Sequence, residues 1–95
     1  MKLWILRPID ENDEPWNPWY DKAFGFIVRA ETAVEARALA EVQAGDESRD
    51  SYKEWGTSEV IEGYGKVWQN PSLSSCIELT PDGPAAVIMK DFHSA

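Results

Sequence analysis

The sequence predicts an α+β fold: a single, mainly antiparallel sheet of about four strands with one principal helix packed on one face, as a two-layer sandwich. Three observations lead to this prediction. Two segments with strand-like alternation stand near the N-terminus, a capped helical segment follows them, and a strand–turn–strand pattern stands near the C-terminus. Because 95 residues provide for one hydrophobic core, we expect a single domain over residues 1–95.

The first strand is expected over residues 3–9, and it is apolar on both faces. The side chains of Leu3 and Ile5 point to one side. Those of Trp4 and Leu6 point to the other side, because successive side chains of a strand alternate. A strand that is apolar on both faces belongs in the interior of a sheet, so we expect it to be the central strand.

A second strand, expected over residues 23–30, leads into the strongest helix signal of the chain. Its alternation divides the side chains between two faces, one with Phe24, Phe26, Val28 and Ala30 and the other with Ile27 and Arg29. Thr32 begins the helix, because Thr32 and Glu35 have the spacing of a capping box. Alanine and leucine follow at helical spacing, and Gly45 stands where the helix is expected to end.

The last part of the chain predicts an antiparallel hairpin. Residues 76–80 alternate as a strand, in which we expect Ile77 and Leu79 to face the core. The sequence Pro-Asp-Gly-Pro at 81–84 is a strong turn signal, and residues 85–92 are expected to form the fourth strand.

The charge balance limits the choice of partners. Seventeen carboxylates against nine lysines and arginines give a net charge of −8. Such a chain repels phosphate backbones and anionic membranes, so direct binding to nucleic acid or membrane is disfavoured, whereas a basic protein surface is attracted. The alternative is that the charge serves only to keep a small protein soluble.

Cysteine usage and the apolar runs indicate the compartment. The single cysteine, Cys76, excludes an intrachain disulfide. The apolar run near the N-terminus is too short for a signal peptide, and no run approaches the length needed to span a bilayer. We therefore expect a cytoplasmic protein.

The sequence shows no motif for catalysis, metal binding or a cofactor. A nucleophile pair of Cys76 and His93 can be imagined, but a cysteine in an apolar strand is far more often a small buried hydrophobe. One cysteine and one histidine give no zinc-site spacing, and the glycines match no phosphate-binding loop. The acidic run at 10–14 lacks the glycine and the distal glutamate of an EF-hand loop. We expect a protein without enzymatic activity and without a cofactor.

Two segments combine carboxylates with aromatic residues and are the candidate binding surfaces. The first is the loop at 10–22, with the candidate residues Asp13, Glu14, Trp16, Trp19, Tyr20 and Asp21. Aromatic side chains serve as anchors at interfaces, and acids beside them suit an Arg-rich target. The alternative is that the loop tryptophans fold back to cover an edge of the core.

The second candidate lies in the stretch 46–66, which has no clear secondary-structure pattern and is expected to be a variable insertion. Its candidate residues are Glu54, Trp55, Glu59 and Glu62. Carboxylates spaced along one face can imitate a phosphate backbone, but they can also form an ordinary solvated surface.

Several segments together resemble a group of small uncharacterised proteins encoded by bacteriophages and prophages. The segments are MKLWILRP at 1–8, PWYDKAFGF at 18–26, RAET at 29–32, and the pairs Asn70-Pro71, Ser75-Cys76 and Asp91-Phe92. The resemblance supplies no catalytic residue. It implies a setting in which small acidic proteins inhibit host defence complexes, anti-CRISPR proteins among them.

The residues and this setting lead to two hypotheses. The first is a non-enzymatic inhibitor that uses an acidic, aromatic surface to block a basic nucleic-acid-binding site on a host protein or ribonucleoprotein complex. The second is a small-ligand or carbohydrate-binding module, in which a tryptophan stacks on the ligand.

Overall fold

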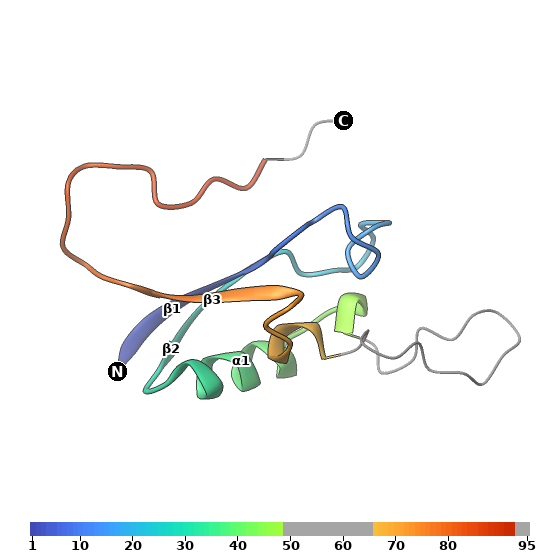
Figure 1. Cartoon of the computed structure of the whole chain (residues 1–95), viewed down its shortest axis with the longest axis horizontal. Helices are drawn as coiled ribbons and strands as arrows, with labels where there is room; N and C mark the ends of the chain where they lie inside the picture. The colour runs from blue at the N-terminus through green and yellow to red at the C-terminus, as the bar shows by residue number, and fades with distance from the viewer. Residues whose placement is uncertain (49–65, 93–95) are drawn as a thin grey trace, which may run out of the picture.

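The computed structural model describes residues 1–48 and 66–92 and shows a small α+β fold with one three-stranded antiparallel sheet and one main helix (Figure 1). The sheet has the order β2-β1-β3. Its strands are β1 (Lys2–Pro8), β2 (Phe26–Ala30) and β3 (Ser74–Leu79). Since β1 lies between the other two, the central position predicted from its two apolar faces is confirmed.

The helix α1 (Ala33–Val42) follows β2 directly. The Thr32 hydroxyl accepts a hydrogen bond from the backbone N–H of Glu35, as the predicted N-cap requires. The helix ends at Val42, before Gly45, and two short 3-10 turns follow, η1 (Asp46–Ser48) and η2 (Val67–Gln69). Gly45 therefore does not close the helix, and its role in the structure is a different one.

The strand register divides the sheet into two faces. On the inner face, Leu6 and Ala30 are buried in one cluster with Ala36 and Ala40 of α1. The cluster is completed by Trp16, Val67 and Trp68. Successive side chains alternate, so the opposite, outer face carries Leu3, Ile5, Arg7, Ile27, Arg29, Ser75, Ile77 and Leu79.

Polar contacts tie the helix to β3. The guanidinium of Arg37 donates to the backbone oxygen of Trp68 and to both the hydroxyl and the backbone oxygen of Ser74. Nearby, the Cys76 thiol lies 4.0 Å from the carbonyl oxygen of Ala33. These contacts give the buried start of β3 its hydrogen-bond partners.

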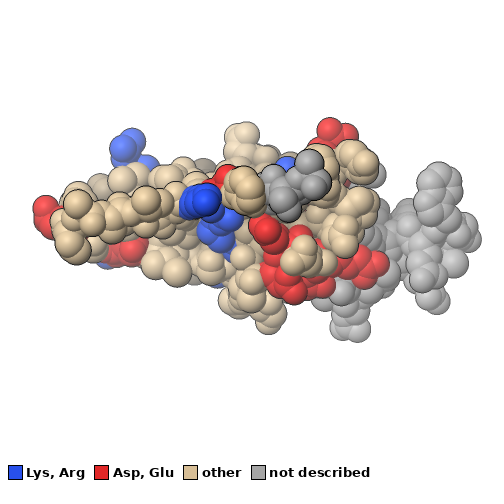
Figure 2. All heavy atoms as spheres, turned by 90° about the horizontal axis from the view of Figure 1, so that it is seen from above, with Lys and Arg blue, Asp and Glu red and all other residues tan. Residues whose placement is uncertain are grey.

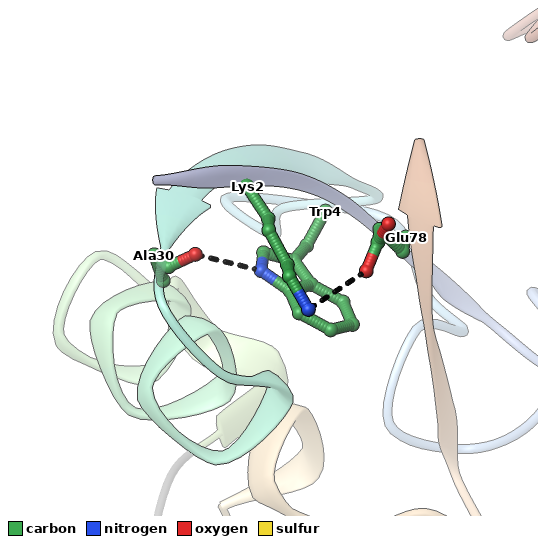
Figure 3. Close-up of polar contacts among 4 residues, drawn as sticks. All are labelled: Lys2, Trp4, Ala30 and Glu78. Atoms are coloured by element: carbon green, nitrogen blue, oxygen red, sulfur yellow. Dashed lines mark hydrogen bonds and ion pairs between the residues drawn. The ribbon is translucent and has the colours of Figure 1, made fainter. Parts of the chain in front are cut away.

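Two side-chain contacts lie on the inner face near the start of β1: a hydrogen bond of Trp4 and an ion pair of Lys2. The Trp4 indole N–H donates to the Ala30 carbonyl oxygen at 3.0 Å, and Lys2 pairs with Glu78 at 3.5 Å (Figure 3). The ion pair joins β1 to β3, but both of its side chains are largely in water, where such pairs contribute little.

The orientation predicted for β3 is wrong. The strand begins at Ser74, and the residues that face the inner side are Ser74 and Cys76. Ile77 is 60% exposed, opposite Ile5 on the outer face. Alternation alone cannot tell which of two faces meets a helix, because a shift of one residue exchanges them.

The predicted fourth strand is not formed. Residues 81–92 of the described chain belong to no strand, and they run as an irregular arm that turns back above the outer face (Figure 1). Proline stands at both ends of the turn, at Pro81 and Pro84, and each lacks the N–H that a hairpin ladder requires. We call residues 81–92 the C-terminal arm.

Most of the predicted variable segment at 46–66 lies outside the described residues. In the ranges that are described, none of the helices has the length and apolar character needed to cross a membrane.

Candidate binding surface

The loop between β1 and β2 is anchored by Trp16. Its side chain is only 1% exposed, its indole N–H donates to the Ala23 carbonyl oxygen at 2.9 Å, and its ring meets Trp68 edge to face at 5.7 Å. A ring of this size, buried and hydrogen-bonded, fixes the loop against the core.

The first half of the loop forms a compact turn ahead of Trp16. The backbone N–H groups of Trp16 and Asn17 both donate to the carbonyl oxygen of Asp13 at 3.0 Å. The Asp13 carboxylate accepts from the Glu14 N–H, and the Asp10 carboxylate accepts from the Asn12 N–H. Short acidic side chains that bond to nearby N–H groups are typical of turns, so two of the loop's acids have a local structural role.

The second half of the loop is held by the buried carboxylate of Glu47. It accepts hydrogen bonds from the backbone N–H groups of Ala23 and Gly45, each with a shortest distance of 2.7 Å. Burial raises the pKa of Glu47, and the N–H donors oppose this rise because they stabilise the ionised form. Glu47 thus joins the end of the loop to the segment after α1.

A close backbone approach completes this junction. Asp21 has φ 52, in the left-handed region, and its carbonyl oxygen accepts from the Asp46 N–H at 2.9 Å. A Cβ at position 45 would collide with the Asp21 carbonyl oxygen, so the backbone can approach only because this residue is glycine. Gly45 therefore serves the attachment of the loop.

Between these two attachments, the loop presents an exposed aromatic pair. Trp19 is 69% exposed and Tyr20 is 68% exposed. Their rings are stacked, with centroids 5.4 Å apart and planes inclined by 23°. Stacked rings restrict each other, so the pair offers a large and ordered contact surface.

Hollows flank the exposed tryptophan. One, of about 280 Å³, is lined by Trp19, Lys22, Phe24 and Asp91, and so brings the loop together with the C-terminal arm. A smaller one, of about 60 Å³, lies between Trp19 and Trp16 and is bordered by Asn12 and Asn17. Burial lowers the pKa of Lys22, while the nearby carboxylates of Asp46 and Glu47 oppose that shift.

The loop that carries the aromatic pair is rich in carboxylates. Its acids are Asp10, Glu11, Asp13, Glu14 and Asp21, of which Glu11 lines the smaller hollow beside Trp19. Seen from above, the largest group of acidic side chains lies in the half of the molecule that holds the loop, and smaller acidic and basic groups lie at the other end (Figure 2). We call the exposed pair and these acids the acidic aromatic loop.

The structure divides the predicted binding residues. Trp19 and Tyr20 are exposed, as an anchor must be, together with Glu14 and Asp21. The assignment of Trp16 as an anchor is wrong, because its ring is buried and the core holds it. Asp13 is half-buried in the turn. The remaining candidates, Glu54, Trp55, Glu59 and Glu62, lie outside the described residues.

The buried role of Glu47 is what sequence reasoning missed. It stands in a charged stretch where a glutamate is expected to be solvated. Its only signal is its position two residues after Gly45, and the partner at Ala23 is distant in sequence.

The described residues show little that points to metal or thiol chemistry. They hold no group of three or more metal-ligating side chains. Burial raises the pKa of the Cys76 thiol, with Arg37 opposing, whereas a reactive cysteine needs a lowered pKa. Its imagined partner, His93, lies outside the described residues.

Comparison with known proteins gives no relative for this chain: no family model matches it, and no curated protein and no solved structure resembles it.

Proposed function

We propose that this chain is a protein-binding inhibitor that docks its acidic aromatic loop on a basic surface of a partner. The observation that carries the proposal is the exposed stack of Trp19 on Tyr20, held out from a loop whose other tryptophan is buried. The proposal takes α1 as the second layer of a two-layer sandwich that supports this loop, since Ala36 and Ala40 share a cluster with Leu6.

Rigid attachment favours binding. The loop is fixed by Trp16 at one side and by Glu47 at the other, so less conformational freedom is lost when the exposed pair meets a partner. Aromatic side chains near the centre of an interface commonly carry much of its binding energy.

The charge around the stack selects the partner. Carboxylates steer a Lys/Arg-rich surface toward the loop, and an arginine can then lie over the face of Trp19 or Tyr20. A basic surface of this kind lines nucleic-acid channels. The charge therefore favours a partner with a basic nucleic-acid-binding site. The resemblance to small phage proteins adds the proposed setting: a host complex in the cytoplasm, with the chain as a phage-encoded, anti-CRISPR-like inhibitor that blocks its channel.

The test measures binding to purified CRISPR effector complexes at about 50 mM and about 200 mM salt. We expect binding that weakens at the higher salt concentration, and a Trp19→Ala, Tyr20→Ala double variant that binds at least about tenfold more weakly. The matched control is Glu31→Gln, which removes an exposed carboxylate outside the loop. Lack of association with every complex at low salt would refute the anti-CRISPR-like form of the proposal.

A second candidate function is the binding of a carbohydrate or another small ligand. The observation that favours it is the hollow of about 280 Å³ beside Trp19, where Lys22 and Asp91 add polar groups to an aromatic wall. Tryptophan fluorescence separates the two functions. A response to sugars that disappears in Trp19→Phe supports the second function, whereas a response only to a macromolecule supports the first.

A further inference from the structure

The outer face of the sheet is largely apolar, although within residues 1–48 and 66–92 no helix lies over it (Figure 1). Its middle row, across the three strands, is Ile27, Ile5 and Ile77, and the next row contains Leu3 and Leu79. Ile27 and Ile77 remain 59% and 60% exposed. An antiparallel sheet that leaves one face to water normally carries polar side chains there, so this face is built to be covered.

The C-terminal arm covers it only in part. Ile88 and Met89 lie opposite Leu3, Ile5 and Ile27 across a hollow of about 590 Å³. The Arg7 guanidinium donates to the Met89 sulfur at 3.5 Å, a weak contact. The lining is mostly apolar, and its polar members are Glu78 and Thr80. Protein interiors are close-packed, so we expect a mostly apolar space of this size to be filled when the surface is fully assembled.

The arm itself is equally short of apolar contacts. Its large apolar side chains remain mostly exposed, and they are Val87, Ile88 and Phe92. The arm leaves β3 through the Pro-Asp-Gly-Pro sequence at 81–84, a short connection that can direct it along its own sheet or onto a neighbour. Exchange of such a segment between identical chains is a common route to a dimer.

The distribution of charge indicates that a second copy of the chain can cover the outer face. The net charge of −8 opposes contact between two copies over most of the surface. The outer face is different because its alternating positions include no carboxylate. The charged residues of this face, Arg7 and Arg29, lie in the outermost rows of the sheet. In a dimer of two copies, their long side chains can therefore place the guanidinium groups at the polar rim of the interface.

We propose that the outer face and the C-terminal arm form a homodimer interface. Each arm crosses onto the outer face of the other copy, so that Ile88 and Met89 of one copy pack on the isoleucine row of the other. The exchange is reciprocal, because a two-fold axis gives each copy one arm and one outer face. The acidic aromatic loop borders the arm at the hollow that Trp19 shares with Asp91, and the exposed stack of Trp19 on Tyr20 leaves each dimer with two loops to present to partners.

The test is the mass of the full-length chain in solution, measured by light scattering and sedimentation over a range of concentrations. We expect a dimer that becomes tighter as salt increases, because salt screens the repulsion between two acidic chains. Ile77→Lys and Ile88→Lys, at exposed positions on the face and the arm, should each weaken the dimer at least about tenfold. The matched control is Val34→Lys, at a helix position that is 79% exposed, which should leave the dimer unchanged.

Two outcomes would overturn the proposal. In the first, the wild-type chain stays monomeric at high salt. In the second, the Ile77→Lys and Ile88→Lys variants still form the dimer, which would mean that its interface lies elsewhere. A monomer whose hollow binds an apolar dye, with loss of dye binding in Ile77→Lys, would assign the groove to a small apolar ligand. Circular dichroism of each variant separates loss of association from loss of fold.

Discussion

Trp16 and Trp19 stand three positions apart in one loop and differ completely in environment. Trp16 is enclosed by the core and bonded to Ala23, whereas Trp19 lies in solvent and touches mainly Tyr20. The difference shows how a small domain can present an aromatic contact surface. One ring contributes its burial energy to the fold, and the fold then holds the other ring in water, where it can contribute to binding.

The largest expected effect on stability is at the buried tryptophan, Trp16. Trp16→Ala removes a ring from the core, and such truncations cost about 3–5 kcal/mol of stability. That is a large fraction of what a domain of this size has, so we expect the variant to be mostly unfolded or to unfold at much lower urea. Urea unfolding followed by circular dichroism measures it. A decrease in the free energy of unfolding of less than about 1 kcal/mol would mean that the Trp16 ring contributes little to the stability of the core.

A smaller effect is expected at the other attachment of the loop. Glu47→Gln keeps the size of the side chain but replaces an acceptor oxygen by an NH₂ group facing the N–H groups of Ala23 and Gly45. Leaving a buried donor unsatisfied costs about 1–3 kcal/mol, which the same unfolding experiment measures at pH 7. Glu31→Gln is the matched control at an exposed carboxylate. Equal stability of the two variants would contradict the role assigned to Glu47.

Glu47 also predicts a pH dependence of stability. Burial raises its pKa in the folded state above the ordinary value of 4.5, so the folded state binds this proton more tightly than the unfolded state does. Its contribution is therefore fully present below pH 4.5 and is lost as pH rises through the raised pKa. Unfolding free energies of Glu47→Gln, measured in steps upward from pH 4, should lack this decline. A wild-type profile that Glu47→Gln reproduces would contradict the prediction.

The smallest expected effect on stability is at the exposed tryptophan, Trp19. Trp19→Ala should change the free energy of unfolding by no more than about 0.5 kcal/mol, because surface substitutions away from the core rarely do more. The same variant should lose partner binding. A Trp19 variant that unfolds as readily as Trp16→Ala would show that both rings belong to the core and that the loop has no exposed anchor.

Sequence reasoning found the elements whose signals are local. The N-cap at Thr32 depends on neighbouring residues, and the central position of β1 follows from its two apolar faces, so both were predictable. The loop was also recognisable, since acids, prolines and aromatic residues gather between two strands. Which of its tryptophans is buried was not, because the answer depends on Trp68, which is remote in sequence.

The errors at the C-terminal side have the same origin. The alternation of β3 is real, but the side on which Ser74 lies is marked by its hydrogen bonds from Arg37, which is distant in sequence, and no pattern within the strand reveals those bonds. The turn signal at 81–84 predicts a hairpin, but the prolines that make the turn also remove N–H groups from any ladder.

The sequence by itself determined the local elements of this protein: a loop rich in acidic and aromatic residues, a helix with its N-cap, and a first strand that is apolar on both faces. Only the tertiary structure decided which of these surfaces are buried. Burial is shared between residues far apart along the chain, as when Glu47 binds Ala23 and Trp16 meets Trp68. Local patterns report what a residue can do, and long-range packing selects which of those possibilities it uses.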